Sequence, residues 1–177
     1  MTPRLSLGRP RRGSSHRGRR PLSPYNLGIR GHTGPQIAAR VATEVPPRLA
    51  RATDPRLVVS FGANDTREVD GARRATLAES LTALEDIRSA IDVPLLVVGP
   101  PAVVDAAQNR RLEELDAALH ASAERLGVPY VGLYASTSTS PLWEREIVDS
   151  DGYHPGAEGY GLLAEIVVPR VLGWLRT

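Results

Sequence analysis

Apolar residues along the chain follow two different spacings from about residue 25 onward. Continuous apolar runs of strand length cover residues 57–61, 95–98 and 128–133. Elsewhere apolar residues recur every three or four positions, and this spacing predicts helices over residues 33–45, 70–91, 104–126 and 157–175. Tyr25–Leu27 is a candidate for the end of a further short strand, and a loop of about 20 residues is expected before His154.

Strands that are apolar throughout, separated by amphipathic helices, are typical of a parallel sheet with helices on both faces. The sequence therefore predicts an α/β fold in which Thr33 caps the first helix and Pro46-Pro47 ends it. Ligands of such folds bind at the carboxyl ends of the strands. We expect functional side chains directly after the predicted strands.

Composition separates the first 24 residues from the rest. Residues 1–24 carry seven arginines and no acidic residue, whereas residues 25–177 carry the other 15 arginines and all 20 acidic residues, a net charge of −5. The first segment is too poor in apolar residues to form a core, so it is predicted to be a basic, disordered arm. Two other interpretations stay open. It is a tether to nucleic acid, which its lack of aromatic residues disfavours, or it results from a mis-assigned start or a reading-frame error.

Several residue types and patterns that carry chemistry are missing from the sequence. The chain has no cysteine, which excludes disulfides, thiolate metal sites and cysteine nucleophiles. The 4 histidines are scattered, so no metal site is predicted. No apolar run reaches the roughly 18–20 residues of a membrane span, and no apolar signal-peptide segment follows the basic N-terminus. We therefore expect a cytoplasmic protein without a membrane span.

Asp151 and His154 lie three residues apart near the C-terminus. A histidine that acts as a general base needs a carboxylate on one ring nitrogen, which fixes the tautomer and stabilises the imidazolium. A tight loop with this spacing brings the two groups together. The alternative is that Asp151 caps the following helix and His154 is an ordinary surface residue. The spacing by itself leaves both interpretations open.

Two further segments offer donors for a negatively charged oxygen. Asn64 follows the predicted strand 57–61, and its amide can face the carboxyl end of the sheet. The segment Asn26–Thr33 has glycines in front of a helix, where backbone N–H groups are free to bind an anion. Each segment is also compatible with an ordinary strand-to-helix turn.

Taken together, three motifs resemble the SGNH (GDSL-type) hydrolase family over residues 25–177. They are Asn-x-Gly-x-x-Gly-x-Thr, then a strand with Gly-x-Asn-Asp, then Asp-x-x-His-Pro before a terminal helix. The resemblance implies a flavodoxin-like three-layer α/β/α sandwich that hydrolyses a small acyl or acetyl ester through an acyl-enzyme, without a cofactor. It implies that His154 is the base, that Asp151 orients it, and that Gly31 and Asn64 are oxyanion donors.

The sequence departs from the family in its first block, where a Gly-Asp-Ser motif after the first strand supplies the nucleophile. No Gly-Asp-Ser occurs in residues 1–30, and Ser6 is the least unfavourable of the serines there. That first strand is central in the family's sheet, so we expect it to be missing or replaced. The prediction is an inactive or impaired serine hydrolase. The alternative is a non-catalytic binding module of the same lineage.

Trp143 lies in the loop that is expected before His154. Its indole either lines an acyl pocket or packs this loop onto the body of the protein. The sequence does not separate these two roles.

Overall fold

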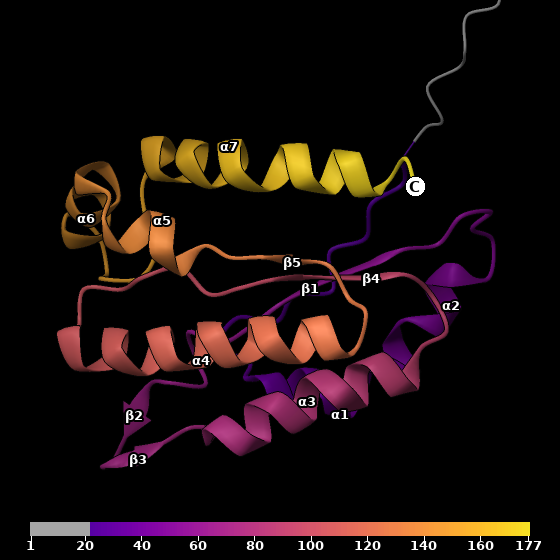
Figure 1. The fold of residues 1–177 in the computed structure, drawn as a ribbon, viewed down its shortest axis with the longest axis horizontal. Helices are drawn as coiled ribbons and strands as arrows, with labels where there is room; N and C mark the ends of the chain where they lie inside the picture. The colour runs from indigo at the N-terminus through magenta and orange to yellow at the C-terminus, as the bar shows by residue number, and fades with distance from the viewer. Residues whose placement is uncertain (1–21) are drawn as a thin grey trace, which may run out of the picture.

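The computed structural model describes residues 22–177, and the candidate nucleophile Ser6 lies outside this range. The described part is a three-layer α/β/α sandwich (Figure 1). Its strands are β1 (Leu57–Ser60), β2 (Glu68–Val69), β3 (Ala72–Arg73), β4 (Leu95–Val98) and β5 (Tyr130–Val131). Its helices are α1 (Gly34–Glu44), α2 (Pro46–Leu49), α3 (Leu77–Ala90), α4 (Ala106–Arg125), α5 (Tyr134–Ser138), α6 (Pro141–Val148) and α7 (Ala157–Trp174).

A parallel sheet with the strand order β1-β4-β5 forms the middle layer. β4 is its centre and pairs with all of β1, Leu57 lying opposite Leu95 and Ser60 opposite Val98. β5 pairs with the second half of β4. All four residues of β4 are buried, as expected of a strand that is covered on both faces. The prediction of a parallel α/β sheet is confirmed.

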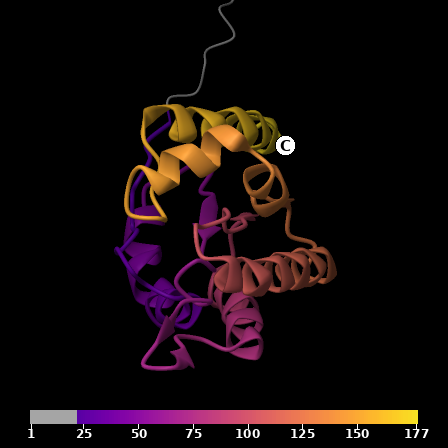
Figure 2. The same ribbon diagram turned by 90° about the vertical axis from the view of Figure 1, so that its left-hand side faces the viewer.

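Helices cover both faces of this sheet. α1, α3 and α4 lie against one face and α7 lies on the other, with α5 and α6 at the end where the strands finish; Figure 2 shows the same layers from the side. The larger core lies under α1, α3 and α4 and includes Phe61, Leu84 and Leu119. On the opposite face, Ile166 and Val167 of α7 pack against buried residues of β4 and β5. No helix within residues 22–177 has both the length and the apolar composition required to cross a membrane.

The predicted helices are present, but α3 does not begin at Asp70. Residues 68–73 instead form the antiparallel hairpin β2–β3. Asp70 and Gly71 both adopt positive φ (53° and 79°), the conformation that a two-residue hairpin turn requires. Thr76 then begins α3 by exchanging hydrogen bonds with Glu79. The Asp-Gly pair in the sequence is typical of such a turn. The helical spacing of the apolar residues after it led to the prediction of a helix from residue 70 instead.

The prediction of a loop of about 20 residues before His154 is wrong, because this segment contains α5 and α6. Ser140 begins α6 by accepting the backbone N–H of Trp143, with Pro141 at the first helical position. Trp143 is 1% exposed and donates its indole N–H to the carbonyl of Ala102 at 2.9 Å. Of the two roles considered for Trp143, the structure supports packing, since its ring is absent from the pocket described below.

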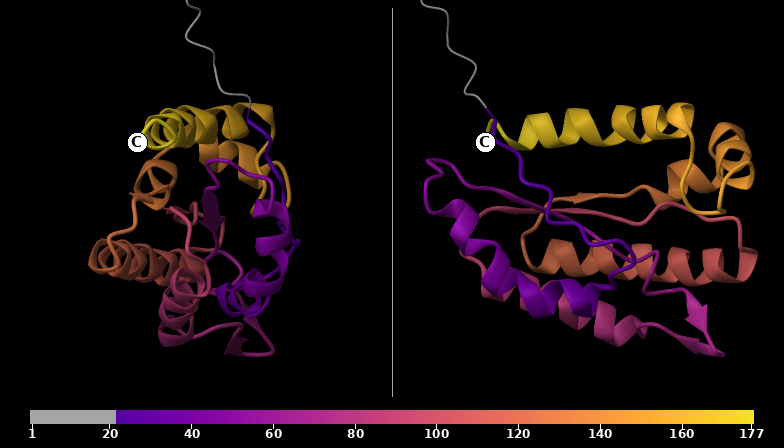
Figure 3. Two further views of the ribbon diagram at one scale, coloured as in Figure 1. Left: turned by 90° about the vertical axis from the view of Figure 1, so that its right-hand side faces the viewer. Right: turned by 180° about the vertical axis from the view of Figure 1, so that it is seen from behind.

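Shorter stretches also differ from the sequence prediction. Pro46-Pro47 end α1 as expected, but they begin the short helix α2, because proline is tolerated in a first helical turn. β5 is shorter than the apolar run 128–133. Tyr25–Leu27 forms no strand: residues 22–29 have no regular structure and run from near the C-terminus towards α1, as Figure 3 shows from behind. Within residues 22–177, no strand pairs with the second edge of β1.

The carboxylate of Asp65 joins three elements at the carboxyl end of β1. It is fully buried (0% exposed) and accepts the backbone N–H of Gly34 at 3.0 and 3.1 Å and the hydroxyl of Ser80 at 2.8 Å. Burial raises the pKa of Asp65, and these hydrogen bonds act in the opposite direction. Gly34 has no room for a side chain, because a Cβ would lie 2.8 Å from the ring of Phe61 and 2.9 Å from the carboxylate. Asp65 thereby fastens the beginnings of α1 and α3 to the loop after β1.

Replacing Asp65 by alanine is expected to lower the free energy of unfolding by about 2–4 kcal/mol, because the Gly34 N–H and the Ser80 hydroxyl lose their acceptor inside the protein. Urea unfolding measures this change. Asp86→Ala on the exposed side of α3 is the matched control, with an expected change below about 0.5 kcal/mol. A loss at Asp65 no larger than the loss at Asp86 would contradict the anchoring role.

Candidate active site

A pocket of about 310 Å³ opens at the carboxyl end of β1. Its walls come from residues 28–32, from α1, from residues 60–64 and from the loop after β4. Gly31, Asn64 and His154 all line this pocket, although they are far apart in the chain. The structure therefore brings together three of the residues that were selected from the sequence.

Asp151 and His154 form a hydrogen-bonded pair in a tight loop. Oδ2 of Asp151 lies 2.8 Å from Nδ1 of His154, while Oδ1 accepts the backbone N–H groups of Tyr153 at 3.0 Å and His154 at 2.9 Å. Gly152 turns the loop with a φ of +83°, and its carbonyl accepts the N–H of Val104 at 3.1 Å. Because the carboxylate binds Nδ1, the ring keeps its proton there and leaves Nε2 as the free base.

The amide of Asn64 has a defined orientation. Its Oδ1 accepts a hydrogen bond from the guanidinium of Arg74 at 3.3 Å, and its Nδ2 donates to the carbonyl of His32 at 3.2 Å. Since arginine can only donate, the two contacts determine which end of the amide faces His32. An amide nitrogen carries two hydrogens, so one of them remains for a ligand in the pocket.

Gly31 supplies a backbone donor on the same side of the pocket. Its φ of +80° favours glycine, and the turn is closed by the N–H of His32, which donates to the carbonyl of Ile29 at 3.2 Å. The N–H of Gly31 has no acceptor within the described part of the chain. Two uncommitted donors in one pocket are what a developing negative charge on a carbonyl oxygen requires.

Comparison with known proteins identifies the lineage of this site. The sequence matches the model of the GDSL-like lipase/acylhydrolase family over residues 5–162. The chain belongs to this family. The match begins at residue 5, upstream of the domain boundary that composition predicts. A search of curated protein sequences gave no match.

Solved structures of other acylhydrolases share the fold. A lipase/acylhydrolase from Enterococcus faecalis is 25% identical, with a TM-score of 0.60 over 81% of this chain and 72% of that chain. A putative acylhydrolase from Bacteroides fragilis is 21% identical, with a TM-score of 0.64 over 82% and 72% of the two chains. A variant of an acetyl-xylooligosaccharide esterase from Geobacillus is 18% identical, with a TM-score of 0.58 over 78% and 67%.

The position of the serines bears on the chemistry that is open to this member of the GDSL-like family. Ser60, the last residue of β1, lines the pocket and was missed because it lies inside a predicted strand. No hydrogen bond links Ser60, or any other serine of residues 22–177, to the ring of His154. Ser23 is exposed and lies outside the pocket lining. The described residues therefore bring a hydrogen-bonded Asp151–His154 pair and two hydrogen-bond donors, the Gly31 N–H and the Asn64 amide, to one pocket, without a serine bonded to the imidazole.

Three residues that hold the acylhydrolase pocket together were also missed. Asp65 follows Asn64 directly, and its position after a strand suggested only a turn. Arg74 and Gln108 gave no signal, because each is a polar residue in a segment with many polar residues. Their partners, Asn64 for Arg74 and Ala63 for Gln108, become visible only in three dimensions.

The Asp151 carboxylate is expected to stay ionised into strongly acidic solution. Hydrogen bonds from the His154 imidazole and from the backbone N–H groups of His154 and Tyr153 lower the pKa of Asp151 from 3.8 to about 2. Because the folded-state pKa is lowered, these bonds stabilise the loop fully above about pH 4 and are lost as the pH falls from there towards about 2. An NMR titration of the Asp151 carboxyl carbon measures the midpoint.

The His154→Ala variant is the control for this titration. It removes the largest of the three contributions, so its midpoint is expected to lie above that of the unmodified chain. A midpoint for Asp151 at or above 3.8 in the unmodified chain is the result that contradicts the prediction.

Proposed function

We propose that this chain carries the proton-transfer and oxyanion-binding parts of a serine hydrolase that acts on small acyl or acetyl esters. The observation that supports this most directly is that Gly31, Asn64 and His154 line one pocket, with Asp151 hydrogen-bonded to the imidazole. Membership of the acylhydrolase family supports the class of reaction. A pocket of about 310 Å³ favours a short acyl group over a long one.

His154 is the general base in this proposal. Its Nε2 takes the proton of a serine hydroxyl as the serine oxygen bonds to the ester carbonyl carbon, and the Asp151 carboxylate stabilises the imidazolium. The carbonyl oxygen becomes negatively charged and accepts hydrogen bonds from the Gly31 N–H and the Asn64 amide. The imidazolium returns its proton to the departing alcohol. Water then hydrolyses the acyl-enzyme by the same route.

The nucleophile limits what the 177-residue polypeptide can do. We propose that it is inactive or impaired, because its sequence contains no Gly-Asp-Ser block and no described serine is bonded to His154. Residues 25–177 are proposed as the hydrolase-like domain, with residues 1–24 outside it, although the family match begins at residue 5. The second candidate function is a binding module that holds an acyl group or a carboxylate without turnover. No described residue bonds to Nε2 of the imidazole, which leaves this atom for a bound carboxylate.

The whole polypeptide is expected to show no fluorophosphonate labelling and no p-nitrophenyl acetate hydrolysis above the level of its His154→Ala variant, because no serine of residues 22–177 is bonded to the imidazole. Ser60→Ala is the second control. Strong labelling that disappears in His154→Ala would contradict the proposed inactivity. If labelling also disappears in Ser60→Ala, Ser60 is the nucleophile; if labelling persists there, another serine reacts.

Acetate, the acid product of an acetyl ester, is expected to bind the pocket with a dissociation constant on the order of 1 mM, measured from NMR shifts of His154 and Gly31. Asn64→Ala is expected to weaken binding roughly three- to tenfold, because it removes a hydrogen bond to the bound oxygen. Ser136→Ala, an exposed residue away from the pocket, is expected to leave it unchanged. Acetate binding without ester turnover favours the binding module. If the chain shows neither acetate binding nor turnover, both candidate functions are removed.

A further inference from the structure

A chain of hydrogen bonds connects the two sides of the pocket through the first turn of α4. The hydroxyl of Tyr153, the neighbour of His154, donates to Oε1 of Gln108 at 3.0 Å. Nε2 of Gln108 donates to the carbonyl of Ala63, the neighbour of Asn64, at 2.7 Å. One glutamine side chain therefore bonds to the residue beside the proposed base and to the residue beside the proposed oxyanion amide.

Gln108 is held firmly in this position. It is 2% exposed, its backbone N–H donates to the Asp105 side chain that caps α4, and Nε2 also contacts Thr66 Oγ1 at 3.2 Å. Both ends of its amide have partners, so the side chain cannot turn over without leaving a buried polar group unpaired. Its orientation is thereby determined.

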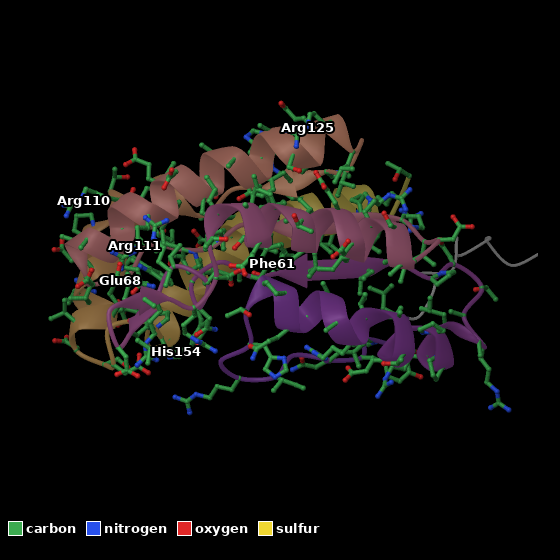
Figure 4. The ribbon with its side chains drawn as sticks, turned by 90° about the horizontal axis from the view of Figure 1, so that it is seen from below. Phe61, Glu68, Arg110, Arg111, Arg125 and His154 are labelled. Carbon is green, nitrogen blue, oxygen red and sulfur yellow. The ribbon has the colours of Figure 1, made fainter. Side chains whose placement is uncertain are left out.

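The next turn of α4 fastens the same loop again. Arg111 Nε donates to the carbonyl of Thr66 at 2.8 Å, and its guanidinium pairs with Glu68 at 3.2 Å. Figure 4 shows Arg111 and Glu68 at the same end of the molecule as His154. The loop that carries Asn64 is therefore fixed to α4 at two successive turns.

The loop that carries His154 has fewer anchors. Its backbone is tied at Gly152, whose N–H donates to Ile147 and whose carbonyl accepts from Val104. The side chain of Tyr153 is what ties it to the opposite side of the pocket, through Gln108 and through Arg67, whose guanidinium carbon lies 5.9 Å from the ring centroid. Among the contacts of the Tyr153 side chain with the described residues, removal of this hydroxyl would leave the weaker ring contact with Arg67.

We propose that Gln108 and Tyr153 are positioning residues that set the separation between the His154 imidazole and the Asn64 amide. This inference rests on the proposed function, because it assigns the two groups to one reaction. A reacting carbonyl must lie within reach of both groups, and a displacement of about 1 Å costs roughly 100-fold in rate. Gln108 acts through its neighbours, since neither it nor Tyr153 lines the pocket.

Two variants of the whole chain distinguish the contributions of the two ends of the hydrogen-bond chain from Tyr153 through Gln108 to Ala63. Tyr153→Phe removes the bond to the His154 loop and keeps the bonds from Gln108 to Ala63 and Thr66. Gln108→Met has a similar length and removes the bonds at both ends. Tyr160→Phe, an exposed tyrosine on α7, is the matched control for loss of a hydroxyl. Tyr153→Phe keeps the test conclusive if Gln108→Met does not fold.

The readouts do not require turnover. ¹⁵N NMR of the imidazole gives the fraction of the Nδ1–H tautomer of His154, and amide hydrogen exchange is followed at His154, Thr66 and Val97. Tyr153→Phe is expected to lower that tautomer fraction and to speed exchange at His154 roughly three- to tenfold, with Thr66 unchanged. Gln108→Met is expected to speed exchange at both His154 and Thr66. Val97, in the centre of the sheet, reports global unfolding and is expected to stay constant.

The proposal is overturned if Tyr153→Phe leaves the tautomer fraction and His154 exchange at the values of Tyr160→Phe. It is also overturned if Val97 exchange rises in parallel with His154 exchange, because the residues then contribute only general stability. If the chain shows neither turnover nor acetate binding but the tautomer shifts, the proposed function is removed and the positioning role stays intact. If acetate binds but the tautomer does not shift, the positioning role is removed and the proposed function stays.

Discussion

The rest of the structure depends on a carboxylate that is fully buried, that of Asp65. Burial disfavours its charge, and it is tolerated because the N-terminus of α1, through Gly34, and the hydroxyl of Ser80 donate to it. The same bonds place the turn that contains Gly31 beside the loop that contains Asn64. The two donors of the pocket thus share one support, in addition to the direct bond from the Asn64 amide to the carbonyl of His32.

The two sides of the pocket are built in different ways. The donor side is a partly buried network in which the guanidinium of Arg74 and the carbonyl of His32 orient the Asn64 amide. The His154 side is a four-residue loop in which the single carboxylate of Asp151 bonds to two backbone N–H groups and one imidazole nitrogen. The first arrangement is held by hydrogen bonds between residues far apart in the chain, and the second by hydrogen bonds within four residues.

Residues whose role is decided locally were predictable from the sequence. The run Leu95–Val98 is apolar throughout, and it is the buried central strand. Asp151 and His154 are close enough in the chain to bond within one turn. Gln108 was not predictable, because a buried glutamine has the same appearance in sequence as an exposed one. The segment before His154 was misjudged because α5 and α6 are too short to show a helical spacing and are stabilised by tertiary contacts, such as that of Trp143 with Ala102.

The side chains of Asp151 and His154 are 48% and 56% exposed, and this exposure has a consequence for the proposed proton transfer. Water around the pair weakens the attraction between the carboxylate and an imidazolium, since that attraction varies inversely with the local dielectric constant. A leaving group that lies over the imidazole expels this water and strengthens the pair during proton transfer. An alcohol too small to cover the ring leaves the pair hydrated. In the proposed reaction, the alcohol half of the ester, as well as its acyl half, then determines how effective the His154 imidazole is as a base.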